Sequence, residues 1–348
     1  MRIKEPNRKW KIAFLCLCLA FVVLSVAGAI GFRSLFRIYD GKIPIVAGNH
    51  KPIDLSALPT PNAELFSAAL SDGTDYYETG EIKEVPIYEQ KKIDRFITSM
   101  LIVVQNGSID AAEKQTDMIF IASYNQLLQK FTVVSIARDT IVPLDENEWK
   151  RINTAYARGG VGQLINTLND LFGLDIQNYV VTGTDELAVL ADGIDGIPAT
   201  LTKQEAKYIN EQTGSTLSAG KQQLTGEQIV TLLLDRTSDN KGDLGRAERQ
   251  LDIVHDAFVY MQEKFDSSFL YPFFHTIFKN VRSNLDFTSL RDVGYEMAVA
   301  EDLSFVTVRF PFDDSFTELN MDGSYAIPPE FEKCRILLQQ TLYGKEVK

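Results

Sequence analysis

The first apolar feature of the chain is residues 12–31, a stretch of 20 residues without a charged side chain. A helix of this length spans about 30 Å, the hydrocarbon thickness of a bilayer. Basic residues precede it, so the positive-inside rule places the N-terminus in the cytoplasm. We therefore predict a basic cytoplasmic tail over 1–11, a transmembrane anchor over 12–31 and an extracytoplasmic remainder. A cleaved signal peptide, cut at Ala27-Gly28-Ala29, is the alternative, but its apolar core would typically be only about 7–15 residues long.

No apolar period persists through residues 32–85, which contain four prolines and many small polar residues. This composition is typical of a stalk or linker. The pattern changes at about residue 86. Short apolar, β-branched runs predict strands at 100–104, 118–122, 131–136, 179–182 and 304–309. Apolar spacings of three and four predict helices at 161–172, 185–192, 226–234 and from about 243 onward. Alternating strands and helices favour an α/β fold, a three-layer α/β/α sandwich with a central mixed sheet over 86–348.

Charge and cysteine content exclude several classes of protein. The chain has a net charge of −12, and its first eleven residues carry +4, so the remainder carries −16. A domain this acidic is a poor candidate for nucleic-acid binding, because neutralised phosphates supply most of that affinity. Three cysteines, two of them in the apolar stretch, provide neither a disulfide framework nor a thiolate metal site.

The common catalytic motifs are missing from the sequence. It contains no G-x-S-x-G, no Walker loop and no H-E-x-x-H, and its three histidines are far apart. Arginines stand instead beside aspartates where apolar elements end: Arg138-Asp139 after a strand, Arg151 and Arg158 around a short motif, Arg236 after a helix, and Asp243, Arg246, Arg249 and Gln250 at a helix start. If Asp243 caps that helix, the last three share one face of its first turns.

Guanidinium groups at a helix N-terminus favour phosphate oxygens. Any one of these arginines more often forms a surface ion pair worth under about 1 kcal/mol. Together, however, they lie where sites on α/β sheets gather. The set therefore predicts a focused phosphate or pyrophosphate site.

The segments also resemble the LytR-CpsA-Psr family of bacterial cell-envelope proteins. The matching stretches are TDMIFIAS, VVSIARDT, RINTAYARGG, LADGIDGIP, LTGEQ and DRTSDNKGDLGRAERQ, in the order of the family over about 100–250. The resemblance implies an α/β/α domain with an apolar pocket for a polyprenyl chain. It also implies transfer of a teichoic acid or capsular glycopolymer from a polyprenyl-pyrophosphate carrier to peptidoglycan, with Mg²⁺ or Mn²⁺.

The resemblance carries over to individual residues. It implies a metal ligand in Asp117 and phosphate binding by Arg138, with help from Arg236 and Arg246. Asp243 would orient the arginines or help to bind the acceptor, and Asp139, Arg151, Arg249 and Gln250 would contact substrate. Phosphoryl transfer needs charge neutralisation and in-line positioning more than covalent chemistry, which suits such a set.

Three positions depart from the pattern of the family. Asn106 stands where a second metal-binding aspartate is usual. It would bind the metal through its carbonyl oxygen without adding a negative charge, and Asp110 could substitute if the loop bends back. Leu234 stands where an additional arginine is common, and Ala137 replaces a proline. One lost charge-assisted contact removes roughly 1.5–3 kcal/mol of stabilisation. A non-catalytic binder of the lipid pyrophosphate is therefore the alternative hypothesis. A transcriptional attenuator would need a DNA-binding module and access to DNA, and the sequence predicts neither.

Overall fold

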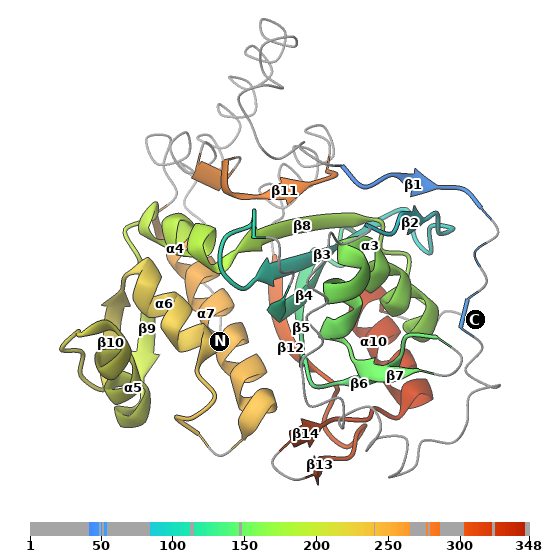
Figure 1. The fold of residues 1–348 in the computed structure, drawn as a ribbon. Coiled ribbons are helices and arrows are strands. Elements are labelled where there is room, and N and C mark those ends of the chain that lie inside the picture. The colour runs from blue at the N-terminus through green and yellow to red at the C-terminus, as the bar shows by residue number, and fades with distance from the viewer. Residues whose placement is uncertain are drawn as a thin grey trace, which may run out of the picture.

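The computed structural model of the chain is built around a six-stranded mixed sheet (Figure 1). It describes residues 42–48, 50, 52–53, 84–111, 115–145, 148–239, 241–264, 276–277, 279–285, 303–321 and 324–344. The strands lie in the order β11 (Arg282–Ser283), β8 (Asn178–Gly183), β3 (Ile97–Gln105), β4 (Thr116–Asn125), β5 (Lys130–Ile136) and β12 (Ser304–Phe310). β3, β4 and β5 form an antiparallel meander, whereas β8 pairs parallel to β3 and β12 pairs parallel to β5. The predicted mixed sheet is confirmed.

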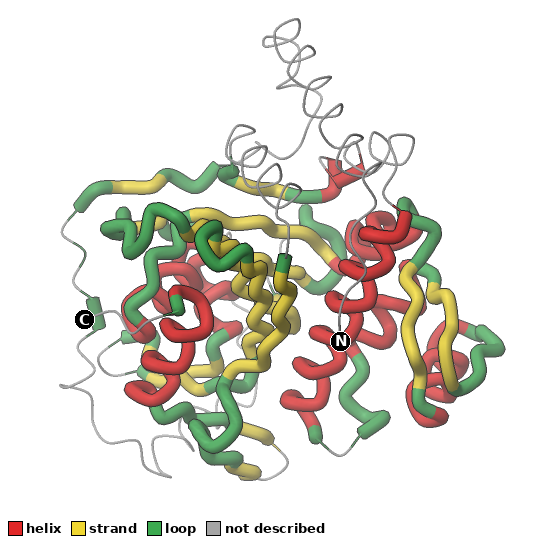
Figure 2. Tube along the Cα trace, turned by 180° about the vertical axis from the view of Figure 1, so that it is seen from behind, coloured by secondary structure: helices red, strands yellow, loops and turns green. Residues whose placement is uncertain are grey.

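Two hydrophobic cores lie on opposite faces of this sheet. Side chains alternate along β4, so Ile119 and Ile121 enter one core while Met118 and Phe120 enter the other. Both faces of the strand are buried, which explains why its sequence is a continuous apolar run. Helices cover both faces, as predicted (Figure 2).

The first core is covered by α3 (Asn153–Phe172) and α10 (Phe331–Tyr343). Leu164, Ile165, Leu168 and Leu171 on α3 are fully buried, at the predicted helical spacing. The helix is kinked at the Gly159-Gly160 pair, where Gly160 has a left-handed φ of 67°. The segment around β2 (Ile87–Tyr88) crosses α3 at this kink. There the backbone N–H of Val85 donates a hydrogen bond of 3.0 Å to the carbonyl oxygen of Gly159.

The second core is covered by α4 (Thr184–Asp192), α6 (Gly226–Leu234) and α7 (Gly242–Lys264). The antiparallel pair of β9 (Ile197–Leu201) and β10 (Gly220–Leu224) extends this layer together with α5 (Lys203–Thr213), which connects the two strands (Figure 1). α5 and α6 both begin with a capping box, Thr202 with Glu205 and Thr225 with Gln228. Each box satisfies backbone N–H groups that have no partner within the helix.

The remaining strands form short pairs. β1 (Ile45–Val46) pairs with β2, β6 (Ile141–Pro143) pairs with β7 (Trp149–Arg151), and β13 (Leu319–Met321) pairs with β14 (Ser324–Ala326).

Part of the predicted stalk lies against the domain. Ile43 N donates to Tyr179 Oη at 3.2 Å. His50 Nε2 contacts Asp170 Oδ2 at 2.7 Å and its ring stacks on Tyr88 with centroids 4.1 Å apart. None of the helices that the structure describes has both the length and the apolar character needed to cross a bilayer. The predicted anchor, residues 12–31, lies outside the described residues.

Candidate functional site

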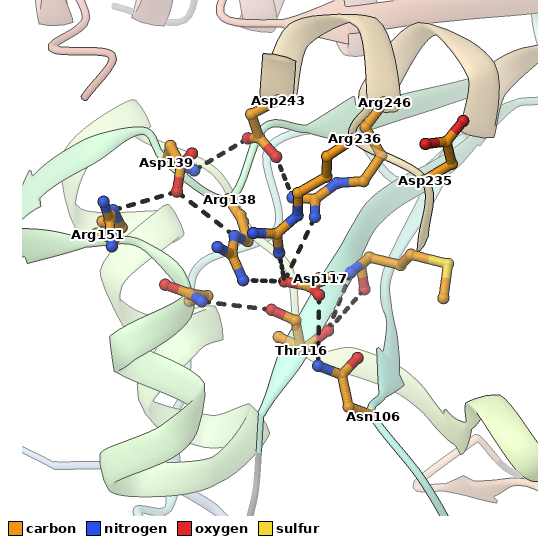
Figure 3. Close-up of polar contacts among 12 residues, drawn as sticks. Asn106, Thr116, Asp117, Arg138, Asp139, Arg151, Asp235, Arg236, Asp243 and Arg246 are labelled. Carbon is orange, nitrogen blue, oxygen red and sulfur yellow. Dashed lines mark hydrogen bonds and ion pairs between the residues drawn. The ribbon is translucent and has the colours of Figure 1, made fainter. Parts of the chain in front are cut away.

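Charged side chains from five parts of the chain, namely β4, the segment after β5, β7, the α6–α7 loop and α7, meet at one end of the central sheet (Figure 3). β3 and β5 end there and the antiparallel β4 begins there, which brings Asn106, Asp117 and Arg138 together. The α6–α7 loop and the first turns of α7 close over them. We call the charged residues of this site the Asp117 cluster: Asp117, Arg138, Asp139, Arg151, Arg236, Asp243 and Arg246.

Asp117 is at the centre of the cluster, and three arginines converge on its Oδ1 atom. Arg138 Nη1 donates to this atom, Arg236 Nη2 does so at 3.0 Å, and Arg246 Nη1 lies 3.6 Å away. Burial alone would raise the pKa of Asp117, but the charges of the three guanidinium groups outweigh it and the pKa is lowered. The carboxylate is therefore ionised at neutral pH.

Further hydrogen bonds and ion pairs join the cluster to α7. Arg246, only 1% exposed, donates through Nη2 to Asp243 Oδ1. The other oxygen of Asp243 accepts from the backbone N–H of Asp139 at 3.1 Å. Asp139 Oδ1 in turn lies 3.1 Å from Arg151 Nε and 3.4 Å from Arg138 Nε. Burial and the Asp243 carboxylate raise the pKa of Asp139 against the opposing effect of Arg138.

The cluster has a surplus of positive charge and of hydrogen-bond donors. Its four arginines and three aspartates give a formal charge of +1, within a chain of net charge −12. Arg138 Nε and Arg246 Nη1 are buried and make no hydrogen bond to the protein, although each lies near a carboxylate. Buried donors without a partner are costly, and an anion with several oxygens would satisfy them. The arrangement suits a phosphate or pyrophosphate group.

Arg249 and Gln250 point in different directions from α7. Gln250 joins the site, donating to the backbone oxygen of Asp117 at 3.3 Å and accepting from Ser135 Oγ at 3.1 Å. Arg249 turns away to Glu205, with Nε 2.8 Å from Oε1. Successive residues on a helix are rotated by about 100°, so these two side chains diverge. Asp243 lies in the first turn of α7, which begins at Gly242, and its carboxylate binds Asp139 and Arg246.

The other arginines of the sequence pattern have local partners. Arg151 also donates to Tyr325 O at 3.2 Å, and Arg158 pairs with Glu148 outside the cluster, with Nη2 2.9 Å from Oε1.

Glu205 was not anticipated from the sequence, where its only signal is the capping-box spacing from Thr202.

A divalent cation would have few ligands at this site. Among the described residues, no group of three or more His, Cys, Asp or Glu side chains is placed to hold a metal ion. Asn106 Nδ2 lies 3.4 Å from Asp117 Oδ2, and the amide oxygen of Asn106 is buried without a hydrogen-bond partner. One carboxylate and one unpaired carbonyl fit Mg²⁺, which keeps several waters. Asp110, the possible substitute ligand, pairs instead with Arg282, whose Nη2 lies 2.5 Å from Asp110 Oδ1.

Two cavities lie elsewhere in the domain. One of about 390 Å³ is lined by α5 residues such as Lys203 and Lys207. The other, about 810 Å³, lies against α3 and is lined by residues that include His50 and Asp170. No member of the Asp117 cluster lines either cavity, and the apolar pocket for a polyprenyl chain remains a prediction.

The fold and the site thus define a mixed α/β domain with an arginine-rich cluster at one end of its sheet. The chain belongs to the LytR-CpsA-Psr family, whose family model (LytR_cpsA_psr) matches residues 77–330. Biofilm regulatory protein A of Streptococcus mutans is 25% identical to it over 242 residues, 64% of this chain and 56% of that protein.

A polyisoprenyl-teichoic acid–peptidoglycan teichoic acid transferase, TagU of Enterococcus faecalis, is 25% identical over 199 residues, 57% of this chain and 64% of that protein. The chain therefore spans under two thirds of the length of both relatives. Among solved structures, Bacillus subtilis TagT with bound octaprenyl pyrophosphate has a TM-score of 0.55 and 16% identity, covering 76% of this chain and 98% of that one. This likeness shows that the fold is shared.

Proposed function

We propose that the chain transfers a teichoic acid or capsular glycopolymer from a polyprenyl-pyrophosphate carrier to peptidoglycan at the outer face of the membrane. The observation that carries the proposal is the Asp117 cluster, where three arginines converge on one carboxylate and two buried guanidinium nitrogens, Arg138 Nε and Arg246 Nη1, make no hydrogen bond. TagU is named as a transferase of this kind, and TagT was solved with a polyprenyl pyrophosphate. Both belong with the family that this chain matches.

The residues of the cluster suit phosphoryl transfer. Arg138 and Arg246 would bind the pyrophosphate through the N–H groups that make no hydrogen bond to the protein, and the more exposed Arg236 would close over it. An acceptor hydroxyl would attack the phosphorus that bears the glycan. The bond from this phosphorus to the bridging oxygen would break, releasing polyprenyl phosphate, and the hydroxyl proton would pass to solvent. Guanidinium groups stabilise the charge on the transferring oxygens.

Mg²⁺ or Mn²⁺ would be held by the Asp117 carboxylate and the amide oxygen of Asn106, and it would offset the charge of the pyrophosphate.

The lipid tail would need apolar surface beside the arginines. Met118 and Phe120 follow Asp117 on β4 and lie in the second core. That core extends to a stack of Phe131, Phe258 and Phe305, in which the last two ring centroids are 4.1 Å apart.

The test is turnover of a polyprenyl-pyrophosphate glycan by the full chain, with peptidoglycan and Mg²⁺ present. Arg138→Ala should abolish the reaction. Arg158→Ala, which removes an arginine paired with Glu148 outside the cluster, should leave it near the wild-type rate. Full activity of Arg138→Ala would refute the proposal.

A non-catalytic binder of the same lipid is the second candidate, and the neutral Asn106 beside Asp117 favours it. The full chain would then bind the lipid pyrophosphate without turnover. Activity gained by combining Asn106→Asp with Leu234→Arg would support this candidate. Protease protection would test the membrane topology: a C-terminal domain protected on the cytoplasmic side would contradict both candidates.

A further inference from the structure

Arg249 connects three separate segments of the helical layer that covers the second core. Its Nε lies 2.8 Å from Glu205 Oε1, its Nη1 donates to Asp235 O at 2.8 Å, and its Nη2 lies 2.6 Å from Asp239 Oδ2. Each of its three nitrogens has a partner, and the side chain is only 7% exposed. This arginine is therefore a structural bridge between α5, α7 and the loop that follows α6.

The loop that Arg249 holds also carries Arg236. Asp235 folds the loop into a compact turn, because its Oδ1 accepts from Thr237 N at 2.7 Å and from Ser238 N at 3.2 Å. Arg236 projects from this turn to Asp117 Oδ1, and its side chain is 41% exposed. An exposed side chain has little packing of its own, so the position of its backbone decides where the guanidinium group lies.

Glu205 is the residue that orients Arg249. Its Oε1 binds Arg249, while its Oε2 accepts from both N and Oγ1 of Thr202 at 2.9 Å, as part of the capping box of α5. The carboxylate is fixed on both sides, and its own side chain is 15% exposed. Removing it would leave the guanidinium of Arg249 buried without its partner on α5, and that group would turn to other acceptors.

We propose that Glu205 is a positioning residue: by orienting Arg249 it holds the 235–239 turn in place and directs Arg236 at the anion site. Within the described part of the chain its side chain binds Thr202 and Arg249 and forms no hydrogen bond or ion pair with a member of the Asp117 cluster. Glu205 thereby adds a direct polar link between α5 and the turn that carries Arg236, beside the packing of α5 on α6 and of β9 on α7. This inference rests on the proposed function, because it assumes that the cluster binds a pyrophosphate.

Two variants separate the positioning role from the helix cap. Thr202→Ala removes the hydroxyl half of the capping box of α5 but keeps the contact of Glu205 with Arg249, whereas Glu205→Ala removes the carboxylate half of the box together with the contact to Arg249. Glu205→Gln, which keeps the volume of the side chain, serves if Glu205→Ala does not fold. The first measurement is hydrogen exchange of the amides of Thr237 and Ser238 in the full chain. Exchange should accelerate in the Glu205 variants and stay at the wild-type rate in Thr202→Ala.

The second measurement is the affinity of the full chain for geranyl pyrophosphate in a double-mutant cycle. Glu205→Ala should weaken binding about five- to tenfold, a part of what one lost charge-assisted contact costs. In an Arg236→Ala background the same change should have almost no effect, because the residue being positioned is gone. Thr202→Ala should bind like the wild type.

The outcomes distinguish this inference from the proposed function. Additive effects of Glu205→Ala and Arg236→Ala, or unchanged exchange at Thr237 and Ser238, would overturn the positioning role while the anion site stands. A wild-type chain that binds no geranyl pyrophosphate would overturn the proposed function, and the exchange experiment would still test the link between Glu205 and the turn.

Discussion

Replacement of Asp117 by asparagine should strongly destabilise the domain. Its side chain is 9% exposed and accepts hydrogen bonds from Arg138 and Arg236, and the fully buried Arg246 forms a third ion pair with it. The formal charge of the cluster would rise from +1 to +2, and three guanidinium groups would lose their shared carboxylate. Breaking a buried pair by neutralising one partner costs about 3–5 kcal/mol. Asparagine still offers one acceptor oxygen, so we expect about 3 kcal/mol, at the lower end of that range.

The assay is urea unfolding of the full chain in detergent micelles with a metal chelator, followed by the fluorescence of the buried Trp149. Urea is preferred because guanidinium ions would screen the cluster. Asp313→Asn is the matched control: this carboxylate also pairs with an arginine, Arg309, but it is 87% exposed. An exposed pair of this kind contributes under about 1 kcal/mol.

Pyrophosphate extends the same test. It should stabilise Asp117→Asn more than the wild type, because its oxygens would meet the guanidinium groups that lost the carboxylate. A loss of stability no larger than that of Asp313→Asn would refute the view that Asp117 holds the arginines together. Equal stabilisation of both proteins by pyrophosphate would refute the view that the anion binds among them.

Three further changes probe the fold and the site. Gly162→Ala should cost about 1–3 kcal/mol in the free energy of unfolding, because a Cβ there would overlap the carbonyl oxygen of Val85, whereas Gly48→Ala has open space and should be nearly neutral. Asn106→Asp should enlarge the stabilisation by Mg²⁺ in thermal unfolding, and a response equal to that of the wild type would argue against a metal beside Asp117. Hydrogen bonds from Thr202 and Arg249 lower the pKa of Glu205 although burial opposes them. Its contribution to stability is therefore present above its unfolded pKa of about 4.3 and is lost as the pH falls through the lower folded value. The stability difference between wild type and Glu205→Gln should accordingly be large at pH 7 and shrink in acid; a difference that is constant with pH would contradict this.

The periodic parts of the fold were predictable from the sequence. The apolar runs at 118–122 and 131–136 lie in β4 and β5, and the spacing at 161–172 lies in the second half of α3. α5 and the antiparallel pair of β9 and β10 were not predicted. β10 has the sequence GKQQL, which is largely polar because it is an outer strand paired only with β9. Strand order also depends on contacts between distant segments, which no local period encodes.

The site was predictable at the level of residue types and only in part at the level of contacts. The convergence of Arg138, Arg236 and Arg246 followed from their positions at the ends of elements. Their common partner, Asp117, depends on β4 starting where β5 ends, which is a matter of register. The different directions of Arg249 and Gln250 depend on which face of α7 meets the sheet. The role of Glu205 depends on a contact with a residue 44 positions away.

The attachment of residues 43–46 to the domain has a consequence for the predicted membrane anchor, because it sets the length of chain that is free between the two. If the chain leaves the bilayer at Gly31, only about a dozen residues separate it from Ile43, which is fastened to Tyr179. Even fully extended, these span about 40 Å. Were the tether free as far as Val85, its reach would be about 190 Å. If the predicted anchor forms, the short parallel pair of β1 and β2 would therefore shorten the free tether, and the domain would stay within about 40 Å of the bilayer surface at its point of attachment.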